Sequence, residues 1–289
     1  MKLLIKIDKY IIAWRLLTCN NDYGIVHGNI LTNVLKEFLT NFLVTADFLN
    51  IKNKIKNFRK EIPCSLICFI SGNDIQLQNK MWKKYRYAYI FIQLCIKYNL
   101  SPFNTIKNII KVINFTIEHP LFINVLNDTK DFMKEISTEW LSKKDQILKI
   151  VKDITKIDVF QDFKATMYVT NKKLNIGRNI SKYYSNRNVF IYSHRNLCDN
   201  YNMSYLIHES LHSVFGSSEI EHAIIELIAD NELRIRLNNG GKYFEHGHDY
   251  LRPMLYKLLP DWIMYLTSNE NIYDFRDKML KKLDQNGYV

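Results

Sequence analysis

Apolar residues recur every three or four positions through much of the first half of the chain. Leucine, valine and phenylalanine follow this spacing between residues 29 and 49, which predicts an amphipathic helix there. The same periodicity predicts helices over 78–98 and 101–119, and one or two more over 121–155. We therefore expect residues 1–155 to be mostly helical, and no motif in them suggests chemistry.

The pattern changes after residue 155, where short β-branched and aromatic runs appear. These runs predict two strands, and the stretches that follow them predict two helices separated by Gly216, Ser217 and Ser218. Ser218, with Glu221 three residues later, forms a capping-box pattern that predicts the start of the second helix. The predicted strands are 163–170 and 189–193, and the predicted helices are 203–215 and 219–238. The fold class expected is α+β and predominantly helical, with a helical region over 1–155 and a second domain over 156–289.

Composition narrows the class of protein. The chain has 289 residues, of which 47% are apolar and 24% charged, as is ordinary for a globular protein. It contains only nine glycines and five prolines, which favours helices over a tight-turned all-β architecture. No apolar run reaches the roughly 18 residues of a membrane span, and charged residues interrupt the first apolar stretch. The five cysteines are scattered, so we expect buried free thiols and a cytoplasmic protein without a membrane span.

Positive charge is concentrated in the first half of the chain. Residues 1–155 carry 23 Lys/Arg against 13 Asp/Glu, whereas residues 156–289 carry 17 against 16. The densest basic segment is Lys52–Lys60. Such a region can bind an anionic partner, either nucleic acid or an acidic surface. The alternative, which we favour, is a compositional bias toward Ile, Asn, Lys and Tyr of the kind that AT-rich coding produces.

The strongest chemical signal is the motif His208-Glu209-Ser210-Leu211-His212. Residues four apart lie on one side of a helix, so both imidazoles can reach one metal ion. Glu209 lies about 100° round the helix, beside the open coordination position, where it can take a proton from an attacking water.

A third ligand is expected on the next helix, in the pattern Glu226-Leu-Ile-Ala-Asp230. In a helical hairpin around Gly216, a rise of about 1.5 Å per residue places Glu226 level with the two histidines. Asp230 lies one turn further along the same face and can reach the outer nitrogen of His208. Two other residues are candidates for the third ligand. Glu219 lies at the turn, and His222 lies one turn before Glu226 on the same face. A histidine at such a position is either a ligand or, more often, a hydrogen-bonded side chain.

With these residues the chain resembles the gluzincin zinc metallopeptidases, the thermolysin-like clan in which H-E-x-x-H is followed by a glutamate ligand on a second helix. The segment Glu-x-x-x-Asp also resembles the third-ligand segment of the CAAX-prenyl-protease family. The resemblance covers about residues 163–250. It implies that His208, His212 and Glu226 bind Zn²⁺, that Glu209 is the general base, and that Asp230 orients His208. It also implies a zincin-like domain in which an edge strand, here 189–193, pairs with an extended peptide or protein substrate.

The sequence thus predicts a zinc-dependent hydrolase of peptide bonds. The resemblance also implies a donor to the oxyanion downstream of the third ligand. His248 is the first candidate and Tyr250 or His246 the next, and the alternative is a residue elsewhere, such as Tyr192 or Tyr205. An alternative is a regulatory or nucleic-acid-binding protein whose zinc site is structural or idle. A further alternative is a protease that acts on a single partner, and the sequence does not distinguish such a protease from a general one.

Overall fold

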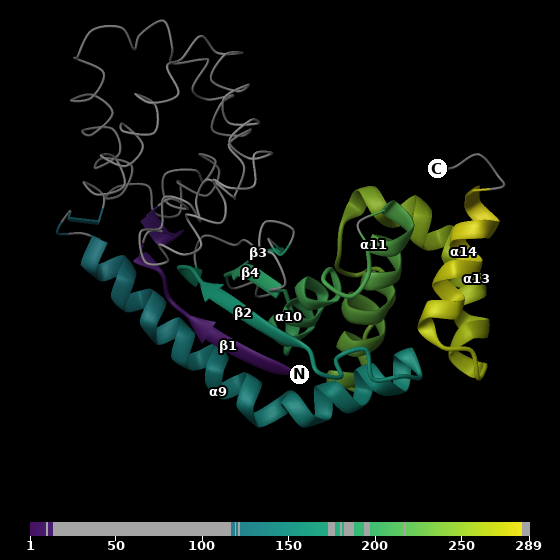
Figure 1. Cartoon of the computed structure of the whole chain (residues 1–289), viewed down its shortest axis with the longest axis horizontal. Coiled ribbons are helices and arrows are strands. Elements are labelled where there is room, and N and C mark those ends of the chain that lie inside the picture. Colours follow the sequence, from purple (N-terminus) through teal and green to yellow (C-terminus); the bar gives the residue numbers. More distant parts are fainter. Residues whose placement is uncertain are drawn as a thin grey trace, which may run out of the picture.

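The computed structural model describes residues 1–9, 11–13, 117–118, 120, 122–172, 177–179, 181, 188–193, 197–216 and 218–284. The helices predicted over 29–49 and 78–98, most of the one predicted over 101–119, and the basic segment Lys52–Lys60 lie outside these residues. The described part is mostly helical and contains one small sheet, in agreement with the α+β class (Figure 1).

The sheet has four strands in the order β1-β2-β4-β3. Strands β1 (Lys2–Lys6), β2 (Lys164–Val169) and β4 (Asn188–Tyr192) run parallel, and β3 (Gly177–Asn179) pairs antiparallel with β4. The two strands predicted from the sequence, 163–170 and 189–193, correspond to β2 and β4 and are confirmed. The expectation that 189–193 is a free edge for substrate is wrong. Both sides of β4 are already hydrogen-bonded, to β2 and to β3, so its main chain has no edge to offer.

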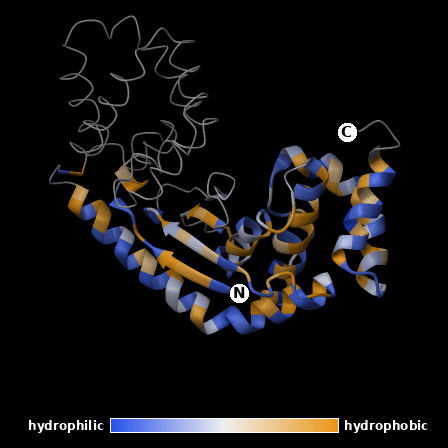
Figure 2. Ribbon diagram, viewed as in Figure 1, coloured by the Kyte–Doolittle hydropathy of each residue, from blue (hydrophilic) through white to orange (hydrophobic). Residues whose placement is uncertain are grey.

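Helix α9 (Phe122–Thr155) is a single helix of 34 residues, where the sequence allowed one or two. Its hydropathy alternates between two faces along the whole length (Figure 2). The apolar face is buried against β1, β2, helix α10 (Tyr201–Leu211) and the π-helix η3 (Leu227–Leu233). Its largest buried side chains are Phe132 and Trp140. Buried residues recur along the whole length of α9, from Phe122 to Thr155, as expected of one amphipathic helix.

The remaining helices follow the sheet in chain order. Helix α10 (Tyr201–Leu211) and α11 (Glu219–Glu226) occupy the positions predicted for the helix pair. The second predicted helix, however, continues through a π-helix, η3 (Leu227–Leu233), before it ends in α12 (Arg234–Leu237). A short 3₁₀ turn, η4 (Asp249–Leu251), then leads into α13 (Arg252–Thr267) and α14 (Ile272–Asp284).

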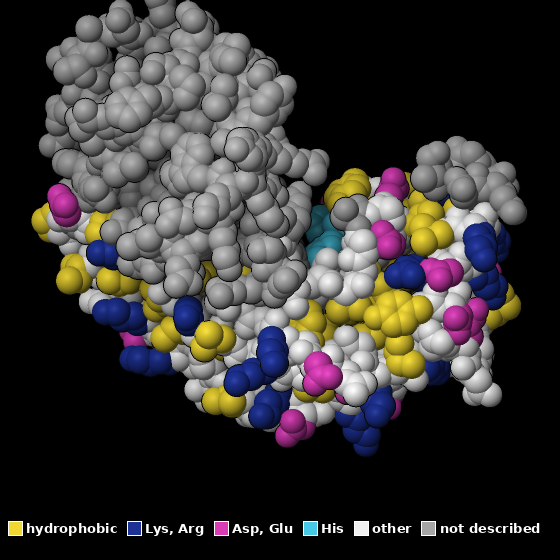
Figure 3. All heavy atoms as spheres, in the orientation of Figure 1, with side chains coloured by type: hydrophobic (Ala, Val, Ile, Leu, Met, Phe, Trp, Pro, Cys, Tyr) yellow, Lys and Arg dark blue, Asp and Glu magenta, His cyan; other side chains and the backbone are white. Residues whose placement is uncertain are grey.

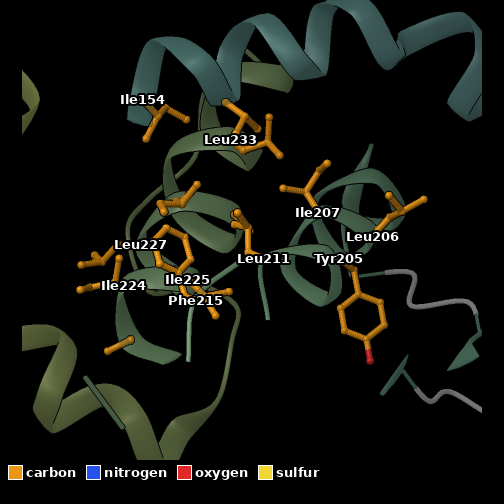
Figure 4. Close-up of a cluster of buried hydrophobic side chains, with 14 of the residues drawn as sticks. Ile154, Tyr205, Leu206, Ile207, Leu211, Phe215, Ile224, Ile225, Leu227 and Leu233 are labelled. Atoms are coloured by element: carbon orange, nitrogen blue, oxygen red, sulfur yellow. The ribbon is translucent and has the colours of Figure 1, made fainter. Parts of the chain in front are cut away.

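The core lies between α9, α10, α11 and η3. Ile207 and Leu211 of α10 face Ile225 of α11 and Leu233 of η3, with Ile154 of α9 above them (Figure 4). Strand β1 and helix α9 precede residue 155 and yet pack with elements that follow it, so both sides of the predicted domain boundary contribute to this core; the boundary itself stays a prediction. Among the described residues, no helix is both long and apolar enough to cross a membrane.

Candidate metal centre

The H-E-x-x-H motif lies at the end of helix α10, and most of its side chains are buried. His208 and Glu209 are 2% and 5% exposed, and the apolar neighbours Leu206, Ile207 and Leu211 are fully buried. His212 directly follows the last residue of α10, and its main-chain N–H still bonds to the carbonyl of His208. The motif is helical, as the sequence predicts, but it lies at the C-terminal end of a helix that ends at Leu211 and not at 215.

The two motif histidines meet at their Nε2 atoms, which lie 3.2 Å apart. Tetrahedral zinc with Zn–N bonds of 2.0–2.1 Å requires ligand nitrogens about 3.3–3.4 Å apart. The observed separation is thus close to that of two imidazoles sharing one zinc ion. Without an ion, this approach requires a proton between the two nitrogens, because two lone pairs at this distance repel.

Asp230 of η3 contacts the Nδ1 side of the His208 ring. Its Oδ2 lies 2.6 Å from Nδ1 of His208, and its Oδ1 accepts a hydrogen bond of 2.9 Å from the hydroxyl of Tyr201. Both carboxylate oxygens are therefore occupied, and the Asp230 side chain is buried. A carboxylate at Nδ1 fixes the tautomer that keeps the Nε2 lone pair for a metal. The contact between Asp230 and His208 is the one that the sequence predicts.

His222 of α11 lies beside both motif histidines. Its ring centroid is 4.6 Å from that of His212 and 5.3 Å from that of His208. Its Nδ1 lies 3.1 Å from the hydroxyl of Tyr250, and its Nε2 is buried with no hydrogen-bond partner in the structure. A buried imidazole nitrogen without a partner is costly unless it binds something, so this atom is a further sign that the cluster fits a metal.

Glu226 contacts His248 twice. Its Oε1 accepts hydrogen bonds of 2.7 Å from the main-chain N–H and 2.6 Å from Nδ1 of His248. The ring of His248 is thereby placed 4.8 Å from that of His222 and 5.8 Å from that of His208. Ligand nitrogens of His208, His222 and His248 all lie within 4.8 Å of one another, and histidine side chains are visible at the surface (Figure 3).

The loop that carries His248 is tied to η3 at two further points. Asn231 accepts a hydrogen bond of 2.7 Å from the main-chain N–H of Phe244. The buried guanidinium of Arg234 bonds to Glu245 and to the carbonyl of Lys242. These contacts come from the π-helix or from the residue that follows it. A π turn changes the direction of side chains after it, which is why such turns are frequent at functional sites.

The surroundings of the cluster give His208 a higher pKa than His212 and His222. Burial alone would lower the pKa of His208, but the carboxylate of Asp230 and the nearby Glu209 and Glu226 raise it to about 8. Burial, together with the positive charge of neighbouring histidines, lowers the pKa of His212 to about 3 and that of His222 to about 3. One imidazole is therefore charged near neutral pH while the two beside it are neutral, the form in which histidine binds metals.

The structure brings together most of the residues proposed from the sequence. His208 contacts both His212 and Asp230 as expected, Glu209 is buried beside His208 in the helix, and Glu226 reaches the same region through its contact with His248. Tyr250 contacts His222, whereas the ring of His246 packs edge-on against Tyr201, 5.1 Å away. Sequence reasoning missed the supporting residues Tyr201, Asn231 and Arg234, which belong to no metal motif and contact the site only through the tertiary fold.

Comparisons with protein-family models, with curated proteins and with solved structures found no match to this chain. The argument for a function therefore rests on the site itself. The cluster fits zinc in the chemistry of its donors and in the spacing of its two motif nitrogens.

Proposed function

We propose that this chain is a zinc metallopeptidase of the zincin type, with residues 156–289 as its catalytic region. The observation that carries the proposal is the 3.2 Å separation of Nε2 of His208 and Nε2 of His212, next to the buried Glu209. Imidazoles at the spacing of zinc ligands, with a carboxylate one residue along the helix, are the parts that metal-assisted hydrolysis of an amide requires.

Each residue of the proposed site has its own role. A bound zinc ion would polarise the scissile carbonyl and lower the pKa of a water beside it. Glu209 accepts the proton of the attacking water and passes it to the leaving amine. Asp230 and Tyr201 keep His208 in one tautomer and one orientation. His248, fixed by Glu226, faces the same centre; as an imidazolium, with one N–H on Glu226, it donates its other N–H to the oxyanion.

The test separates metal binding from proton transfer. The purified full chain should contain one zinc per molecule and cleave a quenched-fluorescent peptide library. Glu209→Gln keeps the shape of the side chain and removes its basicity, so zinc content should stay at one while turnover falls by roughly 10²–10⁴-fold. Glu135→Gln, on the exposed face of α9, is the matched control and should change neither.

Two results would refute the proposal. A wild-type chain that binds no zinc, or a Glu209→Gln variant that cleaves peptides at the wild-type rate, is incompatible with it. Stoichiometric zinc without cleavage of any library would favour the alternative of a structural or idle zinc site.

A further inference from the structure

We infer that His222 is the third metal ligand and that Glu226 is a positioning residue, which fixes His248 instead of binding the metal. This inference rests on the proposed zinc chemistry and changes its ligand set, because the sequence assigned the third position to Glu226. Three observations support it: the arrangement of the imidazole rings, the partners of their Nδ1 atoms, and the direction of the Glu226 carboxylate.

The rings of His208, His212 and His222 are arranged as three corners of a tetrahedron. Imidazoles bound to zinc through Nε2 at 2.0–2.1 Å have ring centroids about 5.2 Å apart when the geometry is tetrahedral. The three centroid distances among these histidines are 5.0, 5.3 and 4.6 Å. His248 fits less evenly, at 4.8 Å from His222 and 5.8 Å from His208, so it lies nearer the fourth corner.

The Nδ1 atom of His222 already has the partner that a metal-binding histidine needs. Metal-binding histidines usually donate their other N–H to an oxygen, which leaves the metal-facing nitrogen with its lone pair. Asp230 takes this role for His208, and the hydroxyl of Tyr250 stands 3.1 Å from Nδ1 of His222. With Nδ1–H donated to Tyr250, the buried and unpartnered Nε2 of His222 has its lone pair free toward His208 and His212.

The carboxylate of Glu226 faces the loop that carries His248. Oε1 accepts both hydrogen bonds from His248. Oε2 is buried without a hydrogen-bond partner in the structure and lies on the side of Gly247, 2.6 Å from the position that a Cβ atom at Gly247 would occupy. Binding of the metal through Oε1 would therefore break the contacts with His248, and Oε2 lies against the loop.

The decisive experiment compares metal affinity and coordination in single variants of the full chain. Zn²⁺ affinity is measured by competition with a chromophoric chelator, and the ligand set is read from the visible spectrum of the Co²⁺-loaded protein. His222→Ala should lower zinc affinity by more than 100-fold, beyond the 10–100-fold range of outer-sphere positions, and should change the Co²⁺ spectrum. Glu226→Gln retains an acceptor for His248, so its Co²⁺ spectrum and its zinc affinity should stay within about threefold of wild type.

A double-mutant cycle tests the positioning role. Glu226→Leu removes the acceptor and should lower kcat by roughly 10–100-fold, whereas Glu226→Gln should restore most of it. In a His248→Ala background, Glu226→Leu should have no further effect on kcat, because there is no ring left to position. The fraction of zinc bound is measured in each variant, so loss of activity is not confused with loss of metal.

The hydroxyl of Tyr250 should matter less than the ring that it contacts. Tyr250→Phe should lower zinc affinity by up to about tenfold, because the tyrosine is 62% exposed and water can replace its hydroxyl. Tyr256→Phe is the matched control, since Tyr256 is equally exposed at 59% and packs against Phe244 instead of a histidine.

The inference and the proposed function fail in different ways. If wild-type protein binds zinc and Glu209 proves essential, but His222→Ala keeps its metal and Glu226→Gln loses it, the inference is overturned and the function stands. If wild-type protein binds no zinc, the proposed function itself is wrong, and the ligand assignment falls with it.

Discussion

Replacing Gly247 with alanine should displace the loop that carries His248. Gly247 has φ of +107°, a backbone conformation that side chains rarely adopt, and an added Cβ would stand 2.6 Å from Oε2 and 2.9 Å from Cδ of Glu226. Glu226 cannot move aside cheaply, because its side chain is fully buried and bonded twice to His248. The loop must therefore shift away from Glu226.

The magnitude follows from two costs. Holding a non-glycine residue in a sparsely populated backbone region costs of order 1–3 kcal/mol. Losing one charge-assisted hydrogen bond between Glu226 and His248 costs about 1.5–3 kcal/mol more. We expect Gly247→Ala to lower the free energy of unfolding by about 2.5–6 kcal/mol, a large share of the 5–15 kcal/mol typical of a domain.

The assay is urea unfolding followed by circular dichroism, in the presence of a chelator so that metal binding does not contribute. Gly240→Ala is the matched control, because its φ is not positive and a Cβ there meets nothing within 4 Å. That variant should be neutral or gain about 0.4–1 kcal/mol from a less flexible unfolded chain. If Gly247→Ala and Gly240→Ala unfold at the same urea concentration, the close packing of the loop against Glu226 is not a feature of the protein.

Three further changes test the supports of the site. Ser218→Ala removes the N-cap of α11, which also bonds to Glu221, and should cost about 1 kcal/mol in urea unfolding, whereas Ser218→Asp should retain most of the stability. Asp230→Asn should weaken zinc binding by about 10–100-fold in chelator competition, because a neutral amide holds His208 less well. Tyr265→Phe leaves a buried main-chain carbonyl of α9 without its hydrogen bond of 2.7 Å, and should lower the free energy of unfolding by about 1–3 kcal/mol.

Local patterns in the sequence were sufficient to predict the elements that carry the motif. The spacing of apolar residues around His208 predicts α10, and Ser218 with Glu221 predicts the start of α11, where the structure shows a complete capping box. The pair of buried strands was also predictable, because β2 and β4 are rich in β-branched and aromatic residues. Each of these signals involves residues close together in the chain.

Contacts between distant segments were not predictable in the same way. Strand β1, at Lys2–Lys6, pairs with β2 more than 150 residues later, and its few apolar residues give no sign of a partner. The loop around His248 reaches Glu226 across 22 residues. Its position depends on Arg234 and Asn231, whose side chains bond to loop atoms that no periodicity in the sequence identifies.

The third ligand that we infer differs from the one predicted from the sequence, although both candidates agree with the helical rise. Counting a uniform rise from the bend places Glu226 level with His208, and it also places His222, four residues after Ser218, level with His212. In the structure α10 ends at Leu211, but main-chain hydrogen bonds of helical spacing continue to Phe215, whose N–H bonds to the carbonyl of Leu211. The ring of His222 stands 4.6 Å from that of His212, in agreement with this count. Because His222 and Glu226 lie one turn apart on the same helix, the choice between them depends on side-chain contacts that the sequence does not show.

The acidic residues of the second helix share one role. Asp230 is bonded to Nδ1 of His208 and Glu226 to Nδ1 of His248, in both cases at 2.6 Å. Each buried carboxylate thus fixes one imidazole, and one helix controls the orientation of two rings that come from different parts of the chain. In the site that we propose, both of these negative charges would lie behind imidazole rings and not on the metal, and Glu209 would be the acidic side chain left for proton transfer.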